Sequence, residues 1–329
     1  MFLKAKEGKN DNGVKIDKKE RFFEDENHSM KGDRRMKVLV LGGTRFFGKR
    51  LVELLIEKGA DVTIGTRGKT ADPFGIRVKR LELDRFNPDS LKATAGSDEW
   101  DIVYDQIGYS PDDAKYACEV FKDRVGHYVF TSSQSVYKMS ETILDEEDFN
   151  PYSYPVRKGD RNQFPYDEGK RLAEAFFYQR SPFPVTAVRF PIVMGVDDYT
   201  ERLLFHVRKV KEGQEIGLSN WKSSLSFISS EEAAAFLAFT GENPFNSPVN
   251  ACSNGSIALK ELMALIEEKT GKTTIVTENI TETNESPYNL PISWVIANDK
   301  AQKAGFQFKN LKEWLPVLIS ELAGEVPTI

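Results

Sequence analysis

A tyrosine and a lysine stand four residues apart in the segment Tyr166-Asp167-Glu168-Gly169-Lys170. The following residues, through Phe177, have a helical composition, so both side chains would lie on one face of a helix. A phenol titrates near about 10 in water, and an adjacent ammonium favours the phenolate and lowers its pKa. The spacing therefore predicts that Tyr166 acts as a general acid or base, assisted by Lys170.

The spacing alone is a weak signal, because Tyr154 and Lys158 share it by chance. A proline between them and the loop composition around them argue against a helix there. A hydroxyl-rich segment strengthens the case for Tyr166, since Thr131-Ser132-Ser133 ends a predicted strand where open parallel sheets bind their ligands. A hydroxyl from this segment would hydrogen-bond the reacting oxygen beside the tyrosine, although the segment taken alone is more simply an ordinary turn.

Short apolar runs alternate with longer helical patterns from residue 36 onward, which is typical of parallel strands joined by crossover helices. A helix is expected over Gly48–Lys58, where an apolar stripe of helical period ends at Gly59. We therefore predict an α/β fold with a doubly wound parallel sheet of the Rossmann type and a smaller C-terminal lobe. The expected strands are Lys37–Leu41, Asp61–Gly65, Val78–Leu83, Asp101–Tyr104, His127–Thr131 and Val185–Phe190.

Three regions are expected along the chain. Residues 1–35 lack periodicity and are predicted to be a flexible extension; a basic arm that grips a partner is disfavoured by the near balance of acids and bases. Residues 36–194 are expected to form the dinucleotide-binding domain. Residues 195–329 are expected to form mainly a substrate-binding lobe, with segments that return to the sheet. Helical patterns in this last region cover Thr200–Lys211, Glu231–Phe239 and Leu259–Glu268.

A glycine-rich turn follows the first expected strand and leads directly into a helix. A turn of this kind accommodates a pyrophosphate, because glycines allow tight geometry and the free N–H groups at the helix start attract anions. The order of strand, turn and helix predicts a dinucleotide site, with an ordinary tight turn as the alternative. The residues assigned to it are Gly42, Gly43, Thr44, Arg45, Phe46, Phe47 and Gly48.

The end of the second strand bears on the choice between NAD and NADP. A carboxylate there would accept hydrogen bonds from the adenosine ribose, but Asp61 starts the strand and its end reads Thr66-Arg67-Gly68-Lys69. Arg67, together with Arg45 from the glycine turn, favours the 2′-phosphate of NADP. Solvated loop charges are the alternative. Asp84, which closes the third strand, is either an adenine contact or an ordinary loop acid.

Composition excludes several classes of protein. A net charge of −5 and a pI near 5.5 give no general basic field for nucleic acid. Two cysteines and three histidines, all far apart, support neither a disulfide framework nor a metal site, and no metal is expected. No apolar run approaches the roughly 20 residues of a membrane span, and no signal peptide is evident. We expect a cytoplasmic protein without a membrane partner.

Together these residues resemble the short-chain dehydrogenase/reductase superfamily, in particular its extended and atypical branch of NAD-dependent epimerases and dehydratases. The resemblance covers most of residues 36–323 and implies that Ser133, Tyr166 and Lys170 form the catalytic site. It implies that Tyr166 exchanges a proton with the substrate hydroxyl, that Lys170 bonds the nicotinamide ribose and that Ser133 polarises the substrate oxygen. It also places Pro191, within Arg189–Gly195, beside the nicotinamide.

Two departures from the family pattern stand out. Arg45 replaces the middle glycine of the usual turn, a Gly-Gly-Thr-Arg-Phe form similar to that of chloroplast stem-loop-binding proteins and related bacterial proteins, some of them RNA-associated. Leu225 stands where sugar-nucleotide epimerases commonly have an arginine near the diphosphate. Trp221 and Lys222 are candidates to compensate, by stacking on a base and meeting a phosphate, and exposed loop positions are an equal alternative.

The resulting hypothesis is an NAD(P)-dependent oxidoreductase or epimerase that acts on a hydroxyl or ketone of a small polar substrate, with sugar derivatives as one class. The main alternative is a non-catalytic dinucleotide-sensing or RNA-associated binding protein on the same fold. A third is a structural partner protein without a cofactor. A homodimer formed through helices that flank the sheet would be common in the resembled superfamily.

Overall fold

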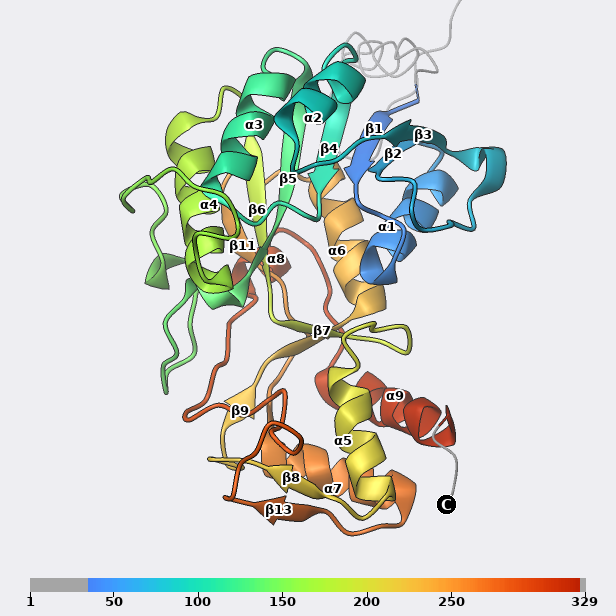
Figure 1. Ribbon diagram of the computed structural model, residues 1–329, viewed down its shortest axis with the longest axis vertical. Coiled ribbons are helices and arrows are strands. Elements are labelled where there is room, and N and C mark those ends of the chain that lie inside the picture. Colours follow the sequence, from blue (N-terminus) through green and yellow to red (C-terminus); the bar gives the residue numbers. More distant parts are fainter. Residues whose placement is uncertain (1–34, 326–329) are drawn as a thin grey trace, which may run out of the picture. The chain divides into compact units, whose positions relative to one another are not determined.

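Seven parallel strands form the central sheet, in the order β11-β6-β5-β4-β1-β2-β3 (Figure 1). The computed structural model describes residues 35–325, so residues 1–34 of the extension predicted over residues 1–35 lie outside the described part, as do residues 326–329. Strands β1, β2 and β3 follow one another toward one edge of the sheet, and β4, β5 and β6 follow one another toward the other edge. The order therefore reverses at β1, which pairs in parallel with both β2 and β4. The strands are β1 Lys37–Leu41, β2 Asp61–Thr66, β3 Lys79–Glu82, β4 Trp100–Asp105, β5 Val125–Ser133, β6 Val185–Phe190 and β11 Pro248–Asn250.

Helices cover both faces of the sheet, because side chains alternate along each strand. On β1, Val38 and Val40 pack with α1 (Phe46–Glu57) and α6 (Ser230–Glu242). Leu39 and Leu41 pack on the opposite face with α3 (Pro111–Phe121) and α4 (Tyr166–Arg180). The shorter α2 spans Pro88–Ala95 and is capped by Asn87, whose side chain accepts from two backbone N–H groups. The sheet, the doubly wound order and the α/β class confirm the predicted fold.

A smaller group of elements packs around its own apolar cluster, with Leu203, Leu262 and Leu315 in its interior. Its helices are α5 Arg202–Lys211, α7 Leu259–Thr270 and α9 Leu311–Glu325. Three two-stranded pairs accompany them: β7 (Ile192–Met194) with β10 (Phe227–Ser229), β8 (Glu215–Gly217) with β13 (Ile275–Thr277), and β9 (Ser224–Leu225) with β12 (Ile257–Ala258). We call this group the second lobe.

Segments after residue 195 also complete the sheet layer. Strand β11 pairs with β6 through Pro248, Val249 and Asn250, and α6 packs beside α1. The short helix α8 (Asp299–Lys303) contributes the buried Ala301 to the same core. Three further single-turn helices, η1 Gly75–Arg77, η2 Gln134–Val136 and η3 Glu146–Asp148, lie in connecting segments. Within the described part of the chain, no helix is both long and apolar enough to cross a membrane.

Candidate active site

The glycine turn follows β1 at the carboxyl edge of the sheet. Gly42 and Gly43 have φ values of 99° and 85°, a region that side chains rarely adopt. A Cβ on Gly43 would lie 2.9 Å from Val40 Cγ1, and one on Gly48 would lie 2.5 Å from Gln106 Oε1. All seven residues assigned to the turn line one crevice. The turn therefore keeps its backbone open to a ligand and leaves no room for larger residues.

The crevice fits a dinucleotide phosphate by two further observations. The helix α1 begins at Phe46, so the N–H groups of its first turn lie next to the glycines. Gln106 Nε2 is buried without a hydrogen-bond partner in residues 35–325, although the side chain lines the same crevice. A buried amide N–H group normally donates a hydrogen bond to an acceptor. A bound phosphate oxygen would accept that hydrogen bond.

Cations gather at the side of the crevice beside the end of β2. Arg45, Arg67 and Lys69 all line it, and Arg45 Nη2 donates to Thr70 Oγ1 at 3.3 Å. Asp61 instead pairs with Lys79 at 2.7 Å at the far end of β2. Asp84 also lines the crevice, where its Oδ1 accepts from Phe86 N at 3.0 Å. The arrangement brings two predicted arginines together beside the end of β2.

Arg161 joins this wall, although no sequence pattern singles it out. Its guanidinium lies over the Phe86 ring at 3.9 Å from the centroid, and Phe86 stacks on Tyr109 at 6.2 Å. Arg161 belongs to the irregular segment between residues 151 and 165, which spacing patterns cannot place in space. Only the fold shows that this segment reaches the crevice lined by the glycine turn, which we call the nucleotide crevice.

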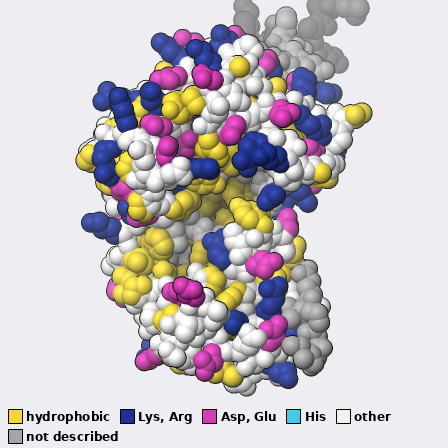
Figure 2. Space-filling view, viewed as in Figure 1, with side chains coloured by type: hydrophobic (Ala, Val, Ile, Leu, Met, Phe, Trp, Pro, Cys, Tyr) yellow, Lys and Arg dark blue, Asp and Glu magenta, His cyan; other side chains and the backbone are white. Residues whose placement is uncertain are grey.

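A second pocket continues from the crevice toward the second lobe, and we call it the reaction pocket. Figure 2 shows a hollow between the sheet layer and the second lobe, with hydrophobic side chains inside it. Ser133, Tyr166, Lys170 and Pro191 all line the reaction pocket. Ser133 is the last residue of β5 and Tyr166 is the first residue of α4. The hydroxyls of Ser133 and Tyr166 line the same pocket because β5 ends and α4 begins at the same edge of the sheet.

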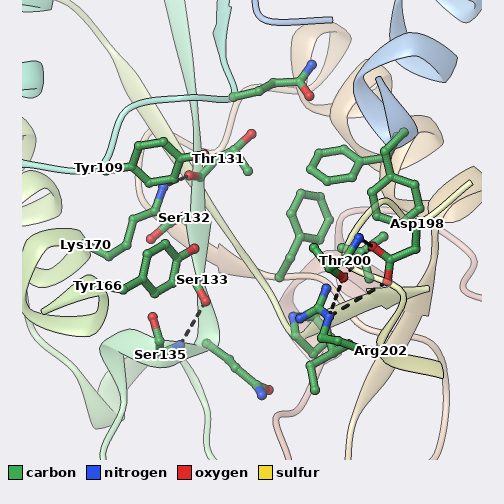
Figure 3. Close-up of a pocket in the computed structure, with 18 of the residues that line it drawn as sticks. Tyr109, Thr131, Ser132, Ser133, Ser135, Tyr166, Lys170, Asp198, Thr200 and Arg202 are labelled. Carbon is green, nitrogen blue, oxygen red and sulfur yellow. Dashed lines mark hydrogen bonds and ion pairs between the residues drawn. The ribbon is translucent and has the colours of Figure 1, made fainter. Parts of the chain in front are cut away.

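The hydroxyl ends of Tyr166 and Ser133 face each other in the reaction pocket (Figure 3). The Ser133 Oγ accepts from Ser135 N at 3.1 Å, which fixes the serine side chain at the start of η2. The flank of the Tyr166 ring is open, and 54% of the residue's surface is exposed. A substrate oxygen placed between the two hydroxyls would be in contact with both.

Lys170 lies one helical turn after Tyr166, and its side chain is fully buried. Its ammonium donates to Gly108 O at 2.6 Å and to Thr131 O at 2.7 Å, and so joins the ends of β4 and β5. The Tyr109 and Phe130 rings each lie 4.7 Å away, which adds cation–π contacts. Burial lowers the pKa of Lys170 to about 8. An ammonium has three N–H donors, so one remains for a ligand.

The structure corrects the expectation that Lys170 lowers the pKa of Tyr166. The pKa of Tyr166 is raised, because burial of the hydroxyl end outweighs the Ser133 hydroxyl and the Arg202 guanidinium, which act in the opposite direction. Lys170 Nζ lies 5.7 Å from the Tyr166 ring centroid and directs two of its donors to backbone oxygens. Tyr166 is consequently a protonated phenol at neutral pH, suited to donate a proton.

A buried ion pair supports the strand end that carries Ser133. Glu174 and Arg189, neither of them exposed, form a bond of 2.6 Å between Oε2 and Nη2. Ser132 Oγ donates to Glu174 Oε1 at 2.5 Å, and Arg189 Nη1 donates to Tyr137 Oη at 2.8 Å. This network ties β5, α4 and β6 together directly behind the reaction pocket. Its members position the hydroxyl edge without facing the pocket themselves, apart from Ser132.

The opposite wall of the reaction pocket comes from residues that the sequence analysis did not assign to a site, although a helix was predicted over Thr200–Lys211. Asp198 and Thr200 approach from the connection between β7 and α5, Arg202 from the first position of α5, and Trp294 from a later loop. Each is a single residue in an irregular segment or at the first position of a helix, so no spacing signal could identify it. Trp294 Nε1 is buried and has no partner within residues 35–325.

Trp221 and Lys222, the two predicted substrate contacts, are not among the residues that line the crevice or the reaction pocket. They lie in the turn before β9, where Trp221 O accepts from Lys260 N at 2.8 Å and Lys222 N donates to Asn220 Oδ1 at 3.0 Å. Trp221 is 47% exposed. The turn is held by the Lys260 backbone and the Asn220 side chain outside these two pockets, and a role of the two residues in substrate binding stays a prediction.

Comparisons with known proteins agree with this geometry. The sequence pattern of the NAD dependent epimerase/dehydratase family matches residues 38–252. The "Chloroplast stem-loop binding protein of 41 kDa b, chloroplastic" of Arabidopsis thaliana is 27% identical over 225 residues, which are 62% of this chain and 55% of that protein. The chain thus spans about half the length of this curated relative.

Solved structures show the same fold. Pal from Bacillus thuringiensis aligns with a TM-score of 0.69 and 18% identity, over 88% of this chain and 99% of that one. UDP-glucose 4-epimerase of Thermus thermophilus, in complex with NAD, aligns with a TM-score of 0.65 and 16% identity, over 88% of this chain and 100% of that one.

The sheet order, the glycine turn and the adjoining pocket define a Rossmann-type protein with a crevice of the kind that binds dinucleotides. The family pattern covers well over half of the chain. The chain belongs to the NAD-dependent epimerase/dehydratase family.

Proposed function

We propose that the protein is an NADP-dependent oxidoreductase or epimerase that acts on a hydroxyl or ketone of a small polar substrate, with sugar derivatives as one class. One observation carries the proposal. Ser133, Tyr166 and Lys170 line a pocket that adjoins the glycine turn, with Tyr109 shared between the pocket and the nucleotide crevice. A dinucleotide on the turn would therefore extend toward the two hydroxyls.

Tyr166 is the proton donor and acceptor in this proposal. Its phenol exchanges a proton with the substrate oxygen, while the Ser133 hydroxyl hydrogen-bonds the same oxygen and holds it in place. The raised pKa of Tyr166 favours the donating direction at neutral pH. The buried Lys170 ammonium maintains the spacing between the ends of β4 and β5 and keeps one N–H for the nicotinamide ribose. A bound nicotinamide dinucleotide supplies the two-electron transfer.

The proposed preference for NADP rests on the adenosine side of the crevice. Arg45 and Arg67 line it, and among the described residues no carboxylate at the carboxyl end of β2 lines it with them. A 2′-phosphate would form charge-assisted hydrogen bonds with either guanidinium. The ribose diol of NAD would leave both cations without an anionic partner.

The decisive test is the Tyr166→Phe variant. Proton transfer by a positioned side chain contributes about 10²–10⁴-fold to rate, so kcat should fall by at least about 100-fold. Binding of reduced dinucleotide, followed by nicotinamide fluorescence, should stay unchanged. Tyr152→Phe is the matched control, because Tyr152 is 53% exposed on the 151–165 segment and lies outside both pockets. Full turnover by Tyr166→Phe would reject the assignment.

A second candidate function is suggested by one relative. The Arabidopsis protein is named for stem-loop binding, and this chain groups Arg45, Arg67, Lys69 and Arg161 along one crevice wall. A nucleic-acid phosphate backbone would suit such a group of cations. This candidate predicts RNA affinity that falls steeply with added salt and is competed by NADP. RNA affinity without competition by NADP would place any such site elsewhere.

A further inference from the structure

Arg202 contributes a guanidinium to the wall of the reaction pocket that faces Tyr166 and Ser133 (Figure 3). It is the first residue of α5, and the preceding Glu201 adopts a left-handed φ of 52°. Such a conformation costs a non-glycine residue about 1–2 kcal/mol. The fold thus starts α5 at the point where this side chain enters the pocket, despite that local cost.

One edge of the guanidinium is held by the protein. Arg202 Nε donates to Thr200 Oγ1 at 2.8 Å and lies 3.8 Å from Asp198 Oδ2. The Asp198 carboxylate is in turn fixed by Thr200, whose N and Oγ1 donate to Oδ1 at 3.0 and 2.6 Å. Neither terminal nitrogen of Arg202 donates a hydrogen bond to another residue in 35–325. The side chain is therefore anchored through Nε while its terminal donors stay available.

The charges around the pocket favour an anion beside Arg202. Lys170, Asp198 and Arg202 are the charged residues that line it within the described range, so cations outnumber carboxylates. Lys170 already donates to two backbone oxygens on the other wall. The fork of an arginine matches a carboxylate or phosphate in a two-point contact. Arg202 is the pocket group best suited to an anionic oxygen group.

We propose that Arg202 binds a carboxylate or phosphate group of the substrate and so holds the reacting carbon–oxygen bond between Tyr166 and Ser133. The proposal rests on the proposed function, because it specifies the substrate class of that same pocket. It also offers an explanation for Leu225, which is fully buried in β9 and supplies no charge. The anion-binding arginine then comes from the start of α5 instead.

The same guanidinium acts on the proton donor. Arg202 is among the groups that lower the pKa of Tyr166, whereas Lys170 is not. A bound anion would partly neutralise this cation and so raise the tyrosine pKa further, which keeps the phenol protonated while substrate is present. Arg202 would then affect both substrate position and the protonation of Tyr166.

The test uses the purified full chain and titrates malonate and inorganic phosphate separately by calorimetry, with and without saturating NADP. Arg202→Met should weaken binding of at least one anion tenfold or more, and Arg202→Lys should retain part of it. Arg208→Met is the matched control, because Arg208 lies on the same helix with its side chain 46% exposed and should bind as the wild type does. The tighter anion identifies a carboxylate or a phosphate as the recognised group.

Two arms separate this proposal from others. Arg67→Met removes a cation of the nucleotide crevice and should leave the Arg202-dependent binding intact. The difference between spectrophotometric titrations of the wild type and of Tyr166→Phe gives the ionisation of Tyr166. The pKa of Tyr166 should rise in Arg202→Met and stay constant in Arg208→Met. Unchanged anion binding in Arg202→Met, or no anion binding in the wild type, would overturn the proposal.

Failure of the proposed function has a different signature. It would appear as wild-type protein that binds no reduced dinucleotide or catalyses no turnover, while the anion titrations without NADP still report on Arg202. Conversely, dinucleotide binding and turnover that persist while Arg202→Met titrates like the wild type would reject only the anion site. Melting curves and dinucleotide affinity of Arg202→Lys show whether the fold has been preserved.

Discussion

Lys170 lies 5.7 Å from the Tyr166 ring centroid yet donates its hydrogen bonds to the backbone oxygens of Gly108 and Thr131. The ammonium therefore joins two strand ends behind the tyrosine instead of bonding the phenol. Because Lys170 is buried, loss of its proton at high pH should favour the folded state. Because it lines the reaction pocket, the same loss should lower activity.

The pH dependence follows from the lowered pKa of Lys170, about 8 against an ordinary value of 10.5. Between these two values Lys170 keeps a proton in the unfolded chain that it has lost in the folded protein, so its own contribution to stability rises with pH. The buried thiols of Cys118 and Cys252, whose pKa is raised to about 12, contribute in the opposite direction. Activity and affinity for reduced dinucleotide should instead fall above about pH 8, because the ammonium donor is lost. The contribution of Lys170 to the free energy of urea unfolding and kcat, measured between about pH 7 and 10, should therefore diverge.

Lys170→Met is the control for this behaviour. The variant cannot titrate at this position, so the unfolding free energy of wild type minus that of the variant should rise with pH above about pH 8. The same pH dependence of unfolding free energy in both proteins would contradict the lowered pKa of Lys170.

Cofactor choice is tested by Arg67→Met and Arg45→Met. A hydrogen bond to a charged group contributes about 1.5–3 kcal/mol, so each variant should bind NADPH about tenfold or more weakly and NADH with unchanged affinity. Nicotinamide fluorescence measures both constants. Arg180→Met, at the exposed end of α4, is the control. Equal losses for both dinucleotides, or a wild type that prefers NADH, would contradict the assignment.

The glycine turn offers a stability test with an internal control. Gly43→Ala places a Cβ 2.9 Å from Val40 Cγ1 at a φ of 85°, whereas Gly59→Ala has a φ of 80° and nothing within 4 Å. The conformation alone costs about 1–2 kcal/mol in both variants, and crowding should add about 1–3 kcal/mol in Gly43→Ala only. Urea denaturation measures the difference. Equal destabilisation would show that Val40 moves aside freely.

The buried pair behind the pocket predicts a large effect on folding. Glu174→Ala would leave the Arg189 guanidinium buried without its carboxylate, which typically costs about 3–5 kcal/mol. Lys58→Ala removes one partner of the exposed pair with Glu242 and should cost no more than about 1 kcal/mol. Both unfolding free energies come from denaturant titration. A small cost for Glu174→Ala would mean that the surrounding polar groups compensate for the lost charge.

Much of the fold could be predicted because hydrophobic patterns in a parallel sheet are local. The predicted bounds of β1 and β6 match the structure, and α1 begins within two residues of its expected start. Strand β11 escaped prediction because three residues give no period. Its pairing with β6 depends on distant parts of the chain.

The site divides along the same line. Ser133 and Tyr166 could be assigned to the site because the hydrophobic pattern shows where a strand ends at one and a helix begins at the other. Arg161, Arg202 and Trp294 were not, since each enters a pocket from an irregular segment or the first position of a helix. The direction of the Tyr166 pKa was also beyond sequence, because spacing to Lys170 reveals neither burial nor the backbone oxygens that the ammonium binds.

The return of β11 and α6 to the sheet has a consequence during synthesis. A ribosome that has released only residues 1–194 has not yet made the strand that flanks β6 or the helix that covers the sheet beside α1. The nucleotide half thus has to wait, with an apolar face uncovered, until roughly the first three quarters of the polypeptide have emerged. The two halves are consequently poor candidates for exchange as independent modules between relatives.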